Sequence, residues 1–234
     1  MVLKNKFIHR FLTGILACSM LLIPVTANAA ADQIEAEMQS AYNKTIESNA
    51  WENWPTGPAV YAESAIVMEA DTGMILYAKD MEAKNYPASI TKIITALIAL
   101  EQCELNEEIT YSYHATHSIE YGSSSIARTE GEILTVEESL YALMLASANE
   151  CANALAEHIS GSSEEFAKLM NRKAKDIGCQ DTYFITPNGL DAEGHYTTAA
   201  DLAKIAAYAI QNETFINQIR IIKKTVVTTK FIIR

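Results

Sequence analysis

The sequence predicts a mixed α/β domain of the α+β type, with an antiparallel sheet flanked by helices and joined to a helical subdomain. Three observations support this fold class. Two short apolar runs on either side of residue 73 have the pattern of a β-hairpin, a block of helical patterns follows them, and a β-branched stretch returns at residues 220–234. When strands lie at both ends of a chain and helices lie between them, the sheet must take strands from both ends.

Composition narrows the class of protein. The 234-residue chain is 49% hydrophobic and 20% charged, which is typical of a globular protein. Its formal net charge is −11. So acidic a surface repels phosphate backbones, and we therefore expect no nucleic-acid partner.

The first 29 residues have the order of a secretory signal peptide. Basic residues at the start precede an apolar run from Phe11 to Val25, and Ala27-Asn28-Ala29 supplies the small residues of a cleavage site. The run is shorter than the roughly 20 residues that a membrane span needs. We therefore expect an exported protein of the cell wall, the periplasmic space or the medium, peripheral to the outer face of the membrane at most.

The rest of the chain divides into a polar lead-in segment over 30–58 and a domain over 59–234. The domain begins with the predicted hairpin, whose strands Ala65 to Met68 and Met74 to Ala78 are joined by a turn that contains Gly73. A run from Ser89 to Glu101 follows, apolar nearly all round, which is typical of a buried helix.

Capping boxes and glycines predict where helices begin and end in the second half of the chain. Ser/Thr-x-x-Glu capping boxes predict helix starts at Thr135 and Ser162. Glycines predict helix ends at Gly161 and Gly178. A last helix is expected over Thr198 to Gln211, whereas residues 110–130 lack periodicity and are expected to form a loop.

The cysteines of the mature chain suit neither a disulfide framework nor a zinc site. Cys103, Cys151 and Cys179 are odd in number and irregular in spacing. We expect three semi-buried thiols, with a single disulfide as the alternative. We expect no cofactor and no metal.

Ser89-Ile90-Thr91-Lys92 is the first motif that carries chemistry. The i, i+3 spacing places the hydroxyl and the amine on one face of a helix. A serine hydroxyl needs a base to become a nucleophile, and burial together with the positive end of a helix lowers the pKa of a lysine that could serve. Free backbone N–H groups at the helix start could stabilise an oxyanion. Chance alone gives on the order of one such pair in a chain of this composition, so a capping serine and a surface lysine remain the alternative.

Ser147-Ala148-Asn149 is the second motif, and it interrupts two apolar helical patterns. By itself it equally fits an ordinary helix–helix turn. Its weight comes from its combination with the first motif.

Together these motifs resemble the penicillin-recognising serine D,D-peptidases, and more narrowly the low-molecular-mass D-alanyl-D-alanine carboxypeptidases of serine peptidase family S11. The resemblance covers about residues 60–215, and it implies the serine β-lactamase/D,D-peptidase-like fold. It is carried by these stretches: Pro87 to Lys92, Leu145 to Asn149, Asp71-Thr72-Gly73, Phe184 to Asp191, and Gly194 to Leu202.

The resemblance implies a role for each motif residue. Ser89 is the acyl-ester nucleophile that attacks the D-Ala-D-Ala bond of a peptidoglycan stem peptide, and Lys92 is its general base. Ser147 relays a proton to the leaving amine. Asn149 binds the substrate amide and fixes Lys92. β-Lactams are the implied inhibitors, and peptidoglycan maturation, cell-wall biogenesis and cell shape are the implied processes.

One family motif is missing. No glycine follows Gly194, so the chain has no Lys-Thr-Gly on a later strand, and Lys224-Thr225-Val226 is the nearest sequence. We therefore expect the domain to be truncated before that strand. The alternatives are a catalytically impaired penicillin- or peptidoglycan-binding remnant, a class A β-lactamase, for which Glu165 lies in the wrong spacing, and a Ser-His-Asp hydrolase.

Overall fold

The computed structural model describes residues 30–217, in two compact units that divide between Glu63 and Ser64. In the first unit, a helix over 30–42 and the short 3-10 helix η1 (Glu47–Ala50) occupy the segment expected as a polar lead-in. The predicted signal peptide and the basic tail from residue 218 lie outside the described residues. Within 30–217, no helix combines the length and the apolar character needed to cross a bilayer.

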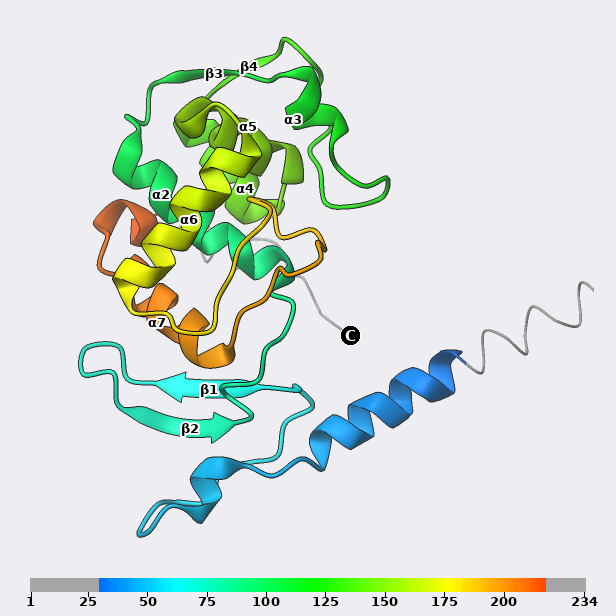
Figure 1. Cartoon of the computed structure of the whole chain (residues 1–234), viewed down its shortest axis with the longest axis vertical. Coiled ribbons are helices and arrows are strands. Elements are labelled where there is room, and N and C mark those ends of the chain that lie inside the picture. Colours follow the sequence, from blue (N-terminus) through cyan, green and yellow to red (C-terminus); the bar gives the residue numbers. More distant parts are fainter. Residues whose placement is uncertain (1–29, 218–234) are drawn as a thin grey trace, which may run out of the picture. The chain divides into compact units, whose positions relative to one another are not determined.

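The second unit combines small antiparallel sheets with a group of helices (Figure 1). Its elements in chain order are β1 (Ala65–Met68), β2 (Ile75–Lys79), η2 (Ala88–Thr91), α2 (Lys92–Gln102), β3 (Glu108–Thr110), α3 (Tyr113–His117), β4 (Ile133–Thr135), α4 (Val136–Leu145), α5 (Asn149–Ser160), α6 (Ser163–Ile177) and α7 (Ala199–Ala209).

The predicted hairpin is confirmed. Strands β1 and β2 pair antiparallel, with Ile66 opposite Ala78. Gly73 lies in the connecting turn with φ +71°, a left-handed conformation that glycine adopts without a steric penalty. The hairpin lies against α7 at one end of the unit (Figure 1).

The capping signals are confirmed as well. Thr135 forms a complete capping box with Glu138 at the start of α4, and Ser162 accepts a hydrogen bond from the Glu165 N–H at the start of α6. Gly161 and Gly178 end α5 and α6, both with positive φ. Interactions within a few residues of each helix end therefore determine where α4 and α6 begin and where α5 and α6 end.

Two regions differ from the prediction. Residues 110–130, expected as a loop, contain the helix α3, and they are flanked by strands β3 and β4, which pair with each other. These strands have only three residues each, too few to show an alternating pattern in the sequence. The helix predicted from Ser89 begins instead as the 3-10 turn η2 and becomes α-helical at Lys92.

Helix α2 lies between two hydrophobic clusters, as its all-round apolar pattern predicted. Leu97 packs in one cluster with residues of α4 and α5, whereas Ile94 and Ile98 pack in the other with residues of α6 and α7. All three side chains are at most 1% exposed. Packing on both sides holds α2 rigidly, and with it the serine and lysine at its N-terminal end.

Candidate active site

The first motif forms a contact between an exposed hydroxyl and a buried amine. Ser89 lies in η2, exposed to solvent, and Lys92 is the first residue of α2 and only 3% exposed. The Lys92 Nζ donates a hydrogen bond to the Ser89 Oγ at 3.0 Å. This is the distance that a general base needs from the proton it removes.

The surroundings of Lys92 favour its neutral form. Burial lowers the pKa of Lys92 to about 8, against the opposing charge of Glu150. Nζ also donates to the carbonyl oxygen of Asn188 at 2.6 Å. Because a carbonyl only accepts, a neutral amine keeps an N–H on Asn188 and can turn its lone pair towards Ser89.

The segment 184–190 supplies that carbonyl and packs closely against η2. The Thr95 Oγ1 donates to the carbonyl of Pro187 at 2.7 Å, one turn along α2 from Lys92. A Cβ on Gly189 would lie 1.9 Å from the carbonyl oxygen of Ala88, the residue before Ser89. Only glycine fits there, and its φ of +82° also favours glycine.

His195 links the segment 184–190 to η2 through hydrogen bonds. Its ring is 1% exposed, and its Nδ1 accepts hydrogen bonds from the backbone N–H groups of Ile185 and Thr186. Nδ1 is therefore the unprotonated nitrogen, and Nε2 donates to the Thr91 Oγ1 at 3.2 Å. Burial also lowers the pKa of His195. The ring positions Thr91, which argues against a Ser-His-Asp arrangement around Ser89.

Two residues at the motifs have a backbone conformation that side chains disfavour. Ala88, directly before Ser89, has φ +46°, and Ser147 has φ +56°. Such residues cost on the order of 1–3 kcal/mol each and cluster at functional sites. The Ser147 Oγ is also buried without a hydrogen-bond partner among the described residues. A buried hydroxyl of this kind is available to a bound molecule.

The end of the second motif is hydrogen-bonded to the segment 123–125. The side-chain amide of Asn149 donates to the Ser123 Oγ at 3.0 Å, and its backbone N–H donates to the Ser124 carbonyl at 2.9 Å. Lys92, which the resemblance expected Asn149 to fix, is held instead by the Asn188 carbonyl. The next residue, Glu150, is fully buried and accepts from the Ser125 hydroxyl at 2.7 Å.

The sequence predicted that Ser89 and Lys92 lie together, but it did not predict the residues that hold Lys92. The sequence predicts no role for Asn188 beyond its place in the stretch Phe184 to Asp191, yet its carbonyl contacts Lys92 and its side chain donates to Asn153 of α5 at 3.0 Å. A backbone carbonyl leaves no trace in residue type, so no motif could reveal this contact. The signals that were available are Gly189, which a close approach requires, and Glu150, a carboxylate inside an apolar helix.

Within residues 30–217, the two histidines of α3 do not share a binding partner. His114 and His117 have a His-x-x-His spacing, but the Nδ1 of His114 contacts Glu157 at 2.7 Å, whereas His117 stacks on Tyr113. Within residues 30–217, Cys103, Cys151 and Cys179 are free thiols. Cys103 and Cys179 are half-buried as expected, whereas Cys151 is fully buried.

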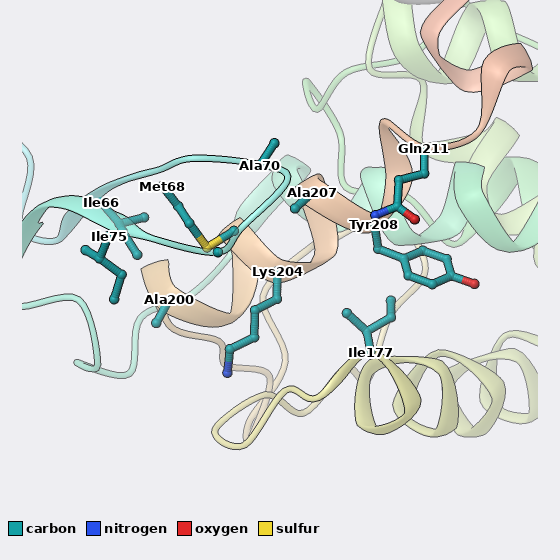
Figure 2. A pocket seen from close by; sticks show the side chains of 11 residues that line it. Ile66, Met68, Ala70, Ile75, Ile177, Ala200, Lys204, Ala207, Tyr208 and Gln211 are labelled. Carbon is teal, nitrogen blue, oxygen red and sulfur yellow. The ribbon is translucent and has the colours of Figure 1, made fainter.

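A pocket of about 370 Å³ lies away from Ser89, between the β1–β2 hairpin and α7. Figure 2 shows Met68 and Ile75 of the hairpin on one side and Lys204 and Tyr208 of α7 on the other. Its lining is largely apolar, and it holds neither motif residue. We assign it no role in the chemistry.

Comparison with known proteins places this geometry in a family. The sequence model of the D-alanyl-D-alanine carboxypeptidase family (Peptidase_S11) matches residues 51–233, a longer stretch than the 60–215 expected, so the match includes most of the basic tail. The chain is 41% identical over 158 residues to the D-alanyl-D-alanine carboxypeptidase DacF of Bacillus subtilis, covering 65% of this chain and 40% of DacF. It is 32% identical over 184 residues to the D-alanyl-D-alanine carboxypeptidase of Streptomyces sp. K15, covering 75% and 60% of the two chains.

Solved structures agree with these matches. Penicillin-binding protein 6B of Escherichia coli superposes with a TM-score of 0.67 at 28% identity, over 76% of this chain and 57% of that one. The carboxypeptidase of Mycobacterium tuberculosis gives 0.65 at 31% identity, over 74% and 64%. The fold is therefore that of the D,D-peptidases, and the chain spans less than two thirds of each of these relatives. On these matches and on its own fold, the chain belongs to the D-alanyl-D-alanine carboxypeptidase family.

Proposed function

We propose that this chain is a serine-type D-Ala-D-Ala carboxypeptidase that removes the terminal D-alanine of peptidoglycan stem peptides through an acyl-enzyme on Ser89. One observation carries the proposal. The exposed Ser89 Oγ lies 3.0 Å from the Nζ of Lys92, a buried lysine whose pKa burial lowers to about 8. A hydroxyl paired with a basic amine in this way is equipped for nucleophilic attack on a carbonyl.

The reaction follows from that contact. The neutral Lys92 Nζ takes the Ser89 proton as Oγ bonds to the carbonyl carbon between the two D-alanines. The C–N bond then breaks, and the D-alanine amine leaves with a proton. A water molecule attacks the resulting ester, frees the shortened peptide and returns the proton to Ser89.

Ser147 and Asn149 have supporting roles in this proposal. The Ser147 Oγ, which has no hydrogen-bond partner within residues 30–217, would relay the proton to the leaving amine, since a buried hydroxyl can donate and accept at once. Asn149 would bind the substrate amide from the start of α5, with its own amide held by Ser123. β-Lactams would acylate Ser89 as mimics of the dipeptide.

The test is intact-mass spectrometry of the protein after incubation with benzylpenicillin, with D-alanine release from a D-Ala-D-Ala peptide measured in parallel. We expect an adduct of one drug mass per chain and release of D-alanine. Both should disappear in Ser89→Ala. Ser118→Ala, which changes an exposed serine at the end of α3, should keep both. A folded protein without an adduct, or an adduct that survives Ser89→Ala, would contradict the proposal.

A second candidate is a protein that binds penicillin or peptidoglycan but turns it over poorly. It is favoured by the absence of a Lys-Thr-Gly anywhere in the sequence, because that motif would hold the terminal carboxylate of the substrate. Loss of an oxyanion-hole donor lowers the rate by about 10²–10³-fold. A Ser89 adduct without D-alanine release would identify this candidate.

We further propose that the protein is exported by the signal peptide over 1–29 and that 59–234 is its peptidase domain, preceded by the segment 30–58. Support comes from the basic-apolar-small order of the first residues. Cell fractionation, with N-terminal sequencing of the extracytoplasmic form, tests this. An uncleaved cytoplasmic protein would contradict it.

A further inference from the structure

We propose that Cys103, Glu107 and His158 form a binding site for a divalent metal ion of borderline-soft character, such as Zn²⁺. One ligand atom from each side chain, a sulfur, a carboxylate oxygen and an imidazole nitrogen, lies within 4.8 Å of the others. Within residues 30–217 this is the only such group of three. The proposal is independent of the proposed peptidase activity.

The three residues meet because three segments converge. Cys103 is the C-cap of α2, Glu107 directly precedes β3, and His158 lies in the last turn of α5. Figure 1 shows the start of β3 close to the helices at this end of the unit. Glu107 and His158 are 51 residues apart in the sequence, so no short spacing could have revealed the site.

The donor set and its spacing suit zinc. Zn²⁺ binds thiolate, imidazole and carboxylate at about 2.0–2.3 Å in a tetrahedral arrangement, which places neighbouring donors roughly 3–4 Å apart. Donors that already lie within 4.8 Å of one another need to approach by only about 1 Å to reach that spacing. Three protein ligands leave the fourth position for a water molecule.

Two ligands are already oriented. The Glu107 Oε1 accepts a hydrogen bond from the Glu104 N–H at 2.6 Å, and its Oε2 lies 2.9 Å from the His158 Nε2. Hydrogen bonds of the first kind orient metal ligands in known sites. The ion would enter between Oε2 and Nε2, where the Nε2–H of His158 now donates a hydrogen bond to Oε2 of Glu107.

The positive charge of the ion would stabilise the two proposed ligands that are anionic when they bind a metal, the Cys103 thiolate and the Glu107 carboxylate. The Cys103 sulfur and a Glu107 carboxylate oxygen lie within 4.8 Å of each other, so one divalent cation between them could coordinate both. On binding, the Cys103 S–H bond and the His158 Nε2–H bond break, and sulfur–metal and nitrogen–metal bonds form. The thiol proton passes to solvent, and the imidazole becomes the tautomer that is protonated at Nδ1.

The site lies far from the chemistry. Ser89 precedes the first turn of α2 and Cys103 follows its last, and an 11-residue helix is about 16 Å long. An ion at Cys103 would tie the end of α2 to the end of α5. We therefore expect it to raise the thermal stability and to leave acylation at Ser89 unchanged.

The experiment titrates the untagged full chain with Zn²⁺ and, separately, with Co²⁺ as a spectroscopic probe. We expect one equivalent of Zn²⁺ per chain, a Zn²⁺-dependent rise in Tm, and a thiolate-to-cobalt charge-transfer band. Cys103→Ser should abolish the band. His158→Gln and Glu107→Gln should weaken Zn²⁺ binding by at least about tenfold, since even outer-shell changes cost 10–100-fold.

Two control variants each remove a residue that has one feature of the proposed metal site but lies outside it. Cys179→Ser removes another half-buried thiol, and His114→Gln removes a histidine paired with a glutamate but without a thiol beside it. Both should bind Zn²⁺ as the parent does. Absence of Zn²⁺ binding by the folded parent, or binding unchanged in Cys103→Ser and His158→Gln, would overturn the proposal. If Cys103→Ser does not fold, the His158 and Glu107 variants decide.

Discussion

At the scale of single residues, the decisive feature of the site is Lys92, whose pKa folding lowers towards neutral pH. Lys92 has two hydrogen-bonded neighbours, the Ser89 hydroxyl and the Asn188 carbonyl, and neither carries a charge. With burial unopposed by a direct ion pair, its pKa falls to about 8. Among the residues that the structure describes, Glu150 supplies the charge that counteracts burial, and its own side chain is buried.

This balance predicts the pH dependence of acylation. Since the proposed mechanism uses the neutral amine as the base, the rate of acylation by penicillin should rise with pH around a midpoint of about 8. Glu150→Gln removes the charge that raises the pKa of Lys92, so the midpoint should move to lower pH. Glutamine keeps an oxygen that accepts from Ser125 and Ile126. The measurement is the acylation rate against pH.

The control for that prediction is Glu157→Gln. It removes a carboxylate from the same helix, but one that contacts Ser112 and His114. Its midpoint should match that of the parent. Equal shifts in both variants, or a shift of Glu150→Gln to higher pH, would show that Glu150 does not act on Lys92 through its charge.

At the scale of elements, the site depends on the fit between η2 and the segment 184–190. Gly189→Ala should displace one from the other, because its Cβ would lie 1.9 Å from the Ala88 carbonyl oxygen. We expect acylation at Ser89 to be lost and stability to fall by more than the roughly 1–3 kcal/mol that a left-handed alanine costs. Penicillin adduct formation and urea unfolding measure the two effects.

Gly194→Ala is the matched control for this fit. Gly194 has nearly the same φ, +84°, but its Cβ would meet only the Ile185 side chain at an ordinary 3.5 Å. It should lose stability by the backbone cost alone and retain acylation. If the two variants lose acylation equally, the close approach to Ala88 is not what positions Ser89.

At the scale of the whole molecule, Lys92 links stability to pH. Its pKa is about 8 in the folded protein and near the ordinary 10.5 when unfolded, so the unfolded state binds more protons between these values. Stability should therefore rise with pH across that window, by about 3 kcal/mol at 1.36 kcal/mol per pH unit. Lys92→Met should lack this contribution. Urea unfolding of both proteins at several pH values measures it, and parallel curves would contradict it.

The sequence predicted the parts of the molecule that depend on neighbours in the chain. Capping at Thr135 and Ser162, the Gly73 turn and the pairing of Ser89 with Lys92 all act within a few residues, so spacing reveals them. Contacts between distant segments were missed. The Asn188 carbonyl meets Lys92 across 96 residues through a backbone atom that every residue type possesses.

That carbonyl has a consequence for how the site tolerates mutation. No substitution at Asn188 can delete a main-chain oxygen, so replacing its side chain leaves the acceptor in place as long as the chain follows the same path. The path itself depends on the next position, where Ala88 leaves no room for a side chain. In a saturation mutagenesis library, the anchor of Lys92 should therefore register as intolerance at Gly189, one position away from the residue whose carbonyl makes the contact.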